Sequence, residues 1–323
     1  MHFVLSRALL LCPVMAFAIQ ALAGDDGPAI GIDAARDLLF EALPDDKAVA
    51  ACLGEESGSE EPGARIRCLI GKRYSGDRKA ARLALKLYDR TGGLAGLLPA
   101  QDFDGDWRGH IALVPNLPIG KDRKHLTFVT GALLEMDAFF AALEKHAGRP
   151  VSYRWRNLGF RFFRSVRRRT PAAFAHGWTI GYNVRGTLNY STHRVCELLF
   201  HEIFHLNDHA HGDWSARALG DIHAQIAKRC GSKVACLTPY APGWLKVRGR
   251  TYYAFMPGHG PEEYAAELSI NYLREQRAIQ TGKKVRQPFK CGPELNARAW
   301  RLLADEFFAG VDLVPDCPKK KPR

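Results

Sequence analysis

The sequence of 323 residues has no internal repeat and no clean linker, and after residue 23 it has no apolar run long enough to span a bilayer. The absence of repeats excludes a repeat architecture. The absence of a long apolar run predicts no transmembrane segment in the mature chain. No nucleic-acid-binding motif is recognisable either, so we expect no nucleic acid partner. Acidic residues are relatively scarce, because Asp and Glu number 34 against 46 Lys and Arg.

The excess of basic residues gives a formal net charge of +12. Such a charge favours anionic surroundings, namely acidic polymers, anionic lipid surfaces or an acidic partner protein. Attraction of this kind weakens as the salt concentration rises, because counterions screen it.

The N-terminus has the pattern of an export signal. Arg7 precedes the apolar run ALLLCPVMAFAI, and Ala21-Leu22-Ala23 provides small residues at the positions before a cleavage site. We predict a signal peptide over residues 1–23 and a secreted or periplasmic protein. The alternative is an N-terminal membrane anchor, for which the run is short and is interrupted by Pro13.

Cysteine usage agrees with an oxidising compartment. Six of the cysteines beyond the signal segment fall into sequence-adjacent pairs in polar stretches, which suggests three disulfides, although spacing alone does not fix their connectivity. The expected pairs are Cys52–Cys68, Cys230–Cys236 and Cys291–Cys317. Cys196 is left over, and we interpret it as a buried free thiol, with a metal ligand or nucleophile as the alternative.

Helical and strand-like patterns occur together, which predicts an α+β fold. Apolar periodicity predicts helices over residues 33–43, 45–53, 77–93 and 131–148. Alternation predicts strands over residues 109–115 and 177–184 and a strand pair with outward arginines within 151–169. We expect a mostly helical region over residues 24–125, packed on or continuous with a second unit over residues 126–323.

The stretch FHEIFHLND, residues 200–208, carries the strongest chemical signal. A helix capped by Ser191 would bury Val195, Leu199, Ile203 and Leu206 on one face. His201 and His205 then project from the opposite face, one turn apart, where both imidazoles can reach one zinc ion. Glu202 can act as the general base for a water molecule beside that metal.

A third ligand is available further along, in PGHGPEEYAAEL, residues 257–268. Pro261 favours the first turn of a helix, on which Glu263 and Glu267 share one face. We predict Glu263 as the third zinc ligand. Glu267 and Asp208 are candidates to accept a hydrogen bond from a ligating imidazole. The alternative for the glutamates is an acidic first turn that the helix dipole favours.

The combination of HEIFHLND and EYAAE resembles the glutamate-zincin metallopeptidases, in particular the catalytic domain of anthrax lethal factor and its relatives, with HExxHxxD followed by ExxAE. The resemblance covers about the C-terminal half. It implies a zincin-like fold over residues 126–323: a twisted sheet with an edge strand over the cleft, an active-site helix beneath it and a second helix that carries the glutamate. It also implies a residue that steadies the oxyanion, for which Tyr252, Tyr253 and His259 lie in the corresponding loop; we take Tyr253.

These patterns lead us to expect a secreted zinc metalloendopeptidase that acts on a protein or peptide substrate, with an anionic one favoured by charge. One alternative is a catalytically silent zinc-binding module. The other is a divergent metzincin, in which His211 is the third ligand of HExxHxxGxxH; Asp208 stands where that pattern has its glycine.

Overall fold

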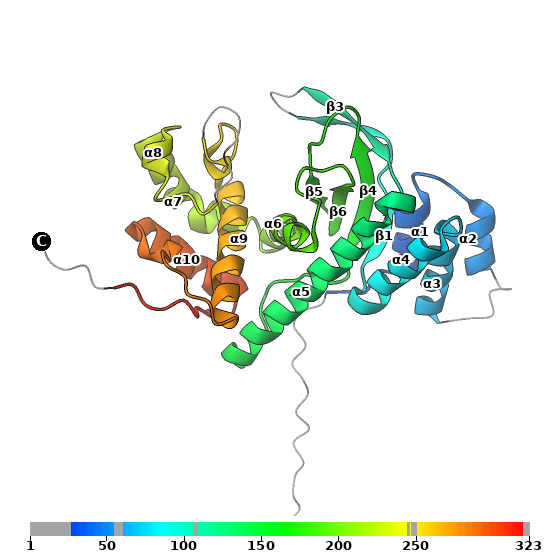
Figure 1. The fold of residues 1–323 in the computed structure, drawn as a ribbon, viewed down its shortest axis with the longest axis horizontal. Helices are drawn as coiled ribbons and strands as arrows, with labels where there is room; N and C mark the ends of the chain where they lie inside the picture. Colours follow the sequence, from blue (N-terminus) through cyan, green and yellow to red (C-terminus); the bar gives the residue numbers. More distant parts are fainter. Residues whose placement is uncertain (1–26, 55–60, 106–108, 244–245, 247–250, 319–323) are drawn as a thin grey trace, which may run out of the picture.

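The computed structural model describes residues 27–54, 61–105, 109–243, 246 and 251–318. These residues form a mixed α+β fold in which helices gather on both sides of a curled six-stranded sheet (Figure 1). The expected α+β class is therefore confirmed. The expected signal peptide, residues 1–23, lies outside the described residues.

Four helices form the N-terminal part of the described chain: α1 Ile32–Phe40, α2 Asp46–Leu53, α3 Pro62–Arg73 and α4 Arg78–Thr91. The predicted helices correspond to α1, α2 and α4. Helix α4 ends at Gly92, whose φ of 67° is left-handed and therefore suits glycine. We did not predict α3. It begins at Pro62, inside the acidic and glycine-rich stretch of residues 54–65, whose composition is typical of a loop.

The sheet has the order β2-β3-β4-β6-β5, and β1 also pairs with β4. Its strands are β1 Leu94–Leu97, β2 Gln101–Asp104, β3 His110–Pro115, β4 Gly159–Ser165, β5 Ala173–His176 and β6 Thr179–Asn183. Strand β4 runs parallel to β1 and β6 and antiparallel to β3. Strands that precede residue 125 thus pair with a strand that follows it, and one sheet crosses the expected boundary.

Strand β4 is apolar because both of its faces are covered. Phe160 and Phe162 join the main core, whereas Phe163 packs with Leu113 and Ile111 in a smaller cluster on the other face. This burial on both sides is typical of a central strand.

The prediction of a strand pair within residues 151–169 is wrong, because the structure has one strand, β4, in this range. Tyr153 and Trp155 are buried at alternate positions, as in a strand. However, the backbone of Arg154 pairs with the Asn207 side chain of the next helix, donating to its Oδ1 at 2.8 Å and accepting from its Nδ2 at 2.9 Å. The Asn207 amide thus makes the backbone hydrogen bonds that a neighbouring strand would otherwise make.

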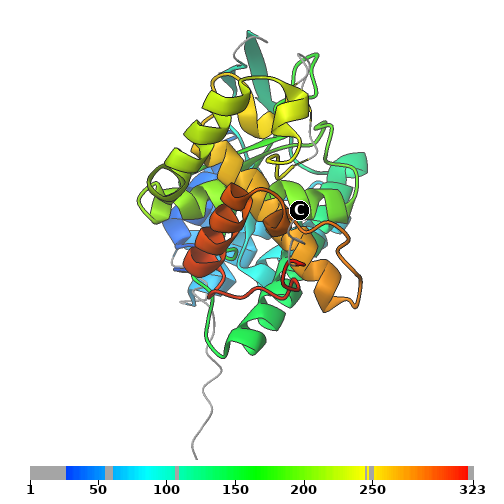
Figure 2. The ribbon, with the colours of Figure 1, turned by 90° about the vertical axis from the view of Figure 1, so that its left-hand side faces the viewer.

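The remaining α-helices of the described residues are α5 Lys124–Ala147, α6 Thr192–Ala210, α7 Trp214–Cys230, α8 Val234–Leu237, α9 Pro261–Gln280 and α10 Glu294–Phe307. Short 3-10 turns occur at η3 Gly120–Arg123, η4 Tyr253–Phe255 and η5 Phe289–Cys291. Helix α6 packs against α5 on one side and α9 on another, so it lies in the middle of the molecule (Figures 1 and 2). The predicted helix over residues 131–148 is α5, which begins earlier.

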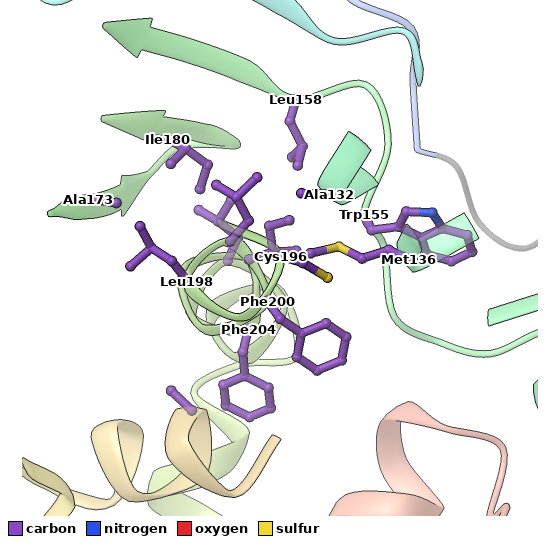
Figure 3. Close-up of a cluster of buried hydrophobic side chains, with 14 of the residues drawn as sticks. Ala132, Met136, Trp155, Leu158, Ala173, Ile180, Cys196, Leu198, Phe200 and Phe204 are labelled. Atoms are coloured by element: carbon purple, nitrogen blue, oxygen red, sulfur yellow. The ribbon is translucent and has the colours of Figure 1, made fainter. Parts of the chain in front are cut away.

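The main core surrounds α6. Figure 3 looks along this helix and shows Leu198, Phe200 and Phe204 projecting from it, with Ile180 of β6 and Met136 of α5 nearby. Each of these side chains is buried. A helix enclosed in this way is held rigidly, and the polar side chains that it carries are held with it.

The three expected disulfides are confirmed, joining Cys52 to Cys68, Cys230 to Cys236 and Cys291 to Cys317. They are consistent with an extracellular or otherwise oxidising location. Cys196 is free and buried, and burial raises the pKa of its thiol to about 12, so it stays protonated at neutral pH.

Within the described residues, one helical stretch, Gly120–Ala147, is long and apolar enough to cross a membrane by length and composition, with a mean hydropathy of 1.6. The prediction that no apolar stretch after residue 23 is long enough to span a bilayer is therefore wrong by length and composition. Half of its most apolar window is buried inside the protein, where α5 packs against α4 and α6. A core helix meets the same criterion, so this is weak evidence for a membrane span.

Candidate metal centre

Helix α6 begins as its sequence predicts. The Ser191 hydroxyl accepts a hydrogen bond from the Arg194 amide at 3.3 Å, which caps the helix. Val195, Leu199, Ile203 and Leu206 are all buried, as expected for its core face. The helix continues to Ala210, which places His201 and His205 well inside a rigid element.

Helix α9 begins at Pro261, whose missing N–H is harmless in the first turn. Its following residues are almost entirely buried, from Tyr264 to Ile270, so the helix is fixed against α6 and α7. Glu263 and Glu267, one turn apart, both approach His201 of α6.

His201, His205 and Glu263 converge on one point. The two Nε2 atoms of the histidines are 3.2 Å apart. Glu263 Oε2 lies 3.1 Å from His201 Nε2 and 3.7 Å from His205 Nε2. Among the described residues these three side chains form a group that could hold a metal ion.

The arrangement fits a divalent cation. Ligand atoms that bind a tetrahedral zinc ion at about 2.0–2.1 Å lie about 3.3 Å from one another, and the three observed separations span 3.1 to 3.7 Å. Moreover, Glu263 Oε2 is buried yet accepts no hydrogen bond from the described residues. A cation at this point would satisfy that oxygen and both imidazoles.

Glu267 approaches the same site from behind. Its Oε1 lies 3.5 Å from Nδ1 of His201, on the opposite side of the ring from the convergence point. Gly243 makes room for it, because a Cβ at this position would meet Glu267 Oε2. The carboxylate therefore stands where it can orient the imidazole.

Charge and burial shape the ionisation of this group. Burial alone would lower the pKa of His201, but Glu263 and Glu267 raise it well above its usual range. Burial alone would raise the pKa of Glu263, but the two imidazoles hold it far below its ordinary value. Since a metal ligand must be deprotonated, a cation would displace the His201 proton and take over this compensation.

Glu202 is buried and lines a cavity of about 400 Å³ that His201 also borders. Burial raises the pKa of its carboxyl, with smaller opposing effects from His201 and His205. A carboxyl with a raised pKa, beside a metal-binding group and open to a cavity, has the placement that a general base needs.

Tyr253 lies on η4 and lines the same cavity. Its hydroxyl donates to Glu263 Oε1 at 3.4 Å, and its ring centroid is 6.0 Å from that of His201. Burial and the nearby carboxylates raise the pKa of this phenol above its usual range, so it keeps its proton and remains a donor. The ring of His259 packs against Tyr253, and its Nδ1 lies 2.9 Å from the Tyr253 carbonyl oxygen.

Asp208 is placed differently from our expectation. Its carboxylate accepts hydrogen bonds from the Ser215 amide and the Ser215 hydroxyl, each at 2.6 Å. Asp208 therefore fastens the start of α7 to the end of α6. The assignment to a ligating imidazole is corrected accordingly, because both oxygens face the α6–α7 junction.

This contact predicts a stability effect without an effect on the metal group. Asp208→Ala leaves two buried Ser215 donors without their acceptor, so the free energy of unfolding should fall by about 1–3 kcal/mol. Urea denaturation measures this, and Asp221→Ala, at an exposed position of α7, is the control, with a change within about 0.5 kcal/mol. A loss of bound metal in a still-folded Asp208→Ala protein would contradict a purely structural role.

His211 lies outside the convergence point. Its Nδ1 is 2.6 Å from Glu306 Oε1 on α10, and its ring packs against Phe307. The alternative ligand set requires the helix to end soon after His205 and the chain to turn back. Helix α6 instead continues to Ala210. This geometry favours Glu263 over His211 as the third ligand.

Sequence reasoning missed the far part of the cavity. Its wall includes residues 170–173, which lead into β5, and residues 187–188, which precede α6. Arg194, Glu197 and Arg274 line it as well. No local pattern marks these residues, since the sheet and α9 bring them together across long sequence separations.

Comparisons with protein-family models, with curated proteins and with solved structures found no match to this chain. The interpretation of the site therefore rests on its own residues.

Proposed function

We propose that this protein is a secreted zinc metallopeptidase of the glutamate-zincin type, with His201, His205 and Glu263 as zinc ligands. The observation that carries the proposal is the convergence of these three side chains beside the buried carboxyl of Glu202, at the edge of a cavity. Zinc bound there would polarise the scissile carbonyl and acidify a water molecule.

The roles of the surrounding residues follow from their positions. Glu202 accepts a proton from the attacking water and passes it to the leaving amine. Tyr253 keeps its phenolic proton and lines the same cavity as Glu202, so its hydroxyl would donate a hydrogen bond to the oxygen on which negative charge develops. Glu267, whose Oε1 lies 3.5 Å from His201 Nδ1, would help to fix the orientation of that ring.

The sheet offers a way to hold an extended peptide. Strand β5 is at one end of the strand order and contacts α6, and Ala173 at its start lines the cavity. An edge strand presents backbone groups with which a substrate chain can pair. This arrangement supports the zincin-like reading of the fold, in which the substrate runs along the edge strand above the active-site helix.

Removal of the metal tests the proposal. Incubation with a strong chelator should lower the hydrolysis of an unfolded, fluorescently labelled protein at least about 100-fold, because the metal supplies several kcal/mol of transition-state stabilisation. Addition of zinc should restore it. A melting curve checks that the chelated protein stays folded. Hydrolysis that persists in metal-free protein would overturn the proposal, and metal binding without any hydrolysis would favour a silent zinc-binding module.

A further inference from the structure

The cavity beside His201 and Glu202 extends along α6 and α9 to a charged end that the proposed chemistry does not use. Its lining includes the small and apolar side chains Ala172, Ala173, Leu188, Leu198 and Ile270, together with Arg194, Glu197 and Arg274. Counted along α6 and α9 away from His201 and Glu267, Leu198 and Ile270 come first, and the three charged residues lie at or beyond them. We call Arg194, Glu197 and Arg274 the charged end of the cavity.

Two arginines enclose the one carboxylate at this end. Arg274 Nε lies 2.6 Å from Glu197 Oε1, and Arg194 Nη1 lies 3.0 Å from Glu197 Oε2. Burial alone would raise the pKa of Glu197, but its contacts with Arg274, His193 and Arg194 lower it, so the carboxylate is ionised. Glu197 thereby positions both guanidinium groups.

The charges at this end do not cancel. Two guanidinium groups against one carboxylate leave one positive charge, because arginine stays protonated in proteins. Each guanidinium has five N–H donors, and Glu197 engages the Nε of Arg274. The Arg274 side chain is 28% exposed, so this positive group is accessible as well as fixed.

We propose that the Arg194–Glu197–Arg274 end of the cavity is a specificity subsite for an acidic side chain of a peptide substrate. This inference rests on the proposed peptidase function. The apolar walls suit the methylene groups of a glutamate or aspartate, and a guanidinium recognises its carboxylate through charge-assisted hydrogen bonds. Glu197 is one helical turn, about 6 Å, from His201, so a residue next to the reacting bond can reach this end.

A peptide library incubated with the wild-type protein gives the cleavage position, and we expect glutamate or aspartate to be enriched on one side of it. Two peptides that differ only in Glu or Gln at that position should then differ at least about tenfold in kcat/KM, as for loss of one charge-assisted contact. Arg274→Gln should reduce this ratio below about threefold. Arg274→Lys should retain part of the preference, because it keeps the charge.

Lys284→Gln is the matched control, since it removes one exposed positive charge beyond the end of α9, at a residue that does not line this cavity. It should leave the ratio unchanged, and a melting curve confirms that each variant is folded. An equal preference in wild type and Arg274→Gln, or no preference in the wild type, overturns the subsite while leaving the peptidase proposal intact.

If no peptide is cleaved, the affinity of the protein for acidic and neutral peptides tests the proposed subsite. Fluorescence anisotropy measures the Kd of the same Glu and Gln peptides, or of glutamate-rich and glutamine-rich library peptides, on a Glu202→Gln background. Tighter binding of the acidic peptide that disappears with Arg274→Gln supports the subsite even if the peptidase proposal fails. Equal Kd values for the two peptides refute it.

Discussion

Glu202→Gln should keep its bound metal and lose peptide hydrolysis by about 10²–10⁴-fold, the range that a positioned acid–base group contributes. The substitution preserves the size of the side chain but removes its ability to accept a proton. Glu202 borders the same cavity as His201 and does not belong to the group of three converging side chains. The measurement is kcat with an unfolded protein substrate, together with metal content by mass spectrometry.

Glu262→Gln is the matched control. Glu262 is exposed and its carboxylate accepts from the Gly260 amide at 2.9 Å, a bond that a glutamine oxygen can also accept. This variant should hydrolyse the substrate as the wild type does. Equal activity of wild type and Glu202→Gln would refute the assigned base. If both proteins bind metal and neither has activity, the silent zinc-binding module becomes the better interpretation.

The parts of the site that the sequence predicts are those that depend on local geometry. The four-residue spacing of His201 and His205 is one helical turn, so a capped helix brings them together whatever surrounds it. Pro261 and the acidic first turn locate the second helix in the same way. The sequence predicted that this helix lies beside α6 because a zinc site with two histidines needs a third protein ligand, which Glu263 could provide.

Other features depend on which elements become neighbours, and the sequence gives no local sign of this. Asp208 has the spacing of a residue that supports a ligand, but the turn into α7 brings Ser215 to its carboxylate first. Tyr153 and Trp155 alternate as in a strand, but Asn207 provides the hydrogen bonds to the backbone between them. In both cases a polar side chain from a distant or later segment decided the structure.

The charged end of the cavity illustrates the same limit. Arg274 follows the glutamates on α9 by two or three turns, and Glu197 precedes His201 by one, yet both are ordinary helix residues in the sequence. Their 2.6 Å contact arises because α6 and α9 pack side by side. The formal charge of +12 predicted an anionic partner, but it did not indicate where on the protein such a partner would bind.

The third ligand decides between the two zincin patterns, and we expect Glu263→Ala to lose most of its bound zinc. The affinity should fall by more than the about 10–100-fold that removal of a supporting partner costs. The reason is that Glu263 Oε2 lies within 3.1 to 3.7 Å of both imidazole Nε2 atoms. Glu267→Ala, which removes the partner of His201 Nδ1, should fall in the smaller range.

His211→Ala is the matched comparison, because His211 is the alternative third ligand. It removes a contact with Glu306 on α10, 2.6 Å long, and so costs some stability, but His211 is not among the three converging side chains. Zinc content and hydrolysis per folded molecule should therefore match the wild type. If His211→Ala loses the metal and Glu263→Ala keeps it, α6 must end soon after His205 in the active protein, and the chain is then a divergent metzincin.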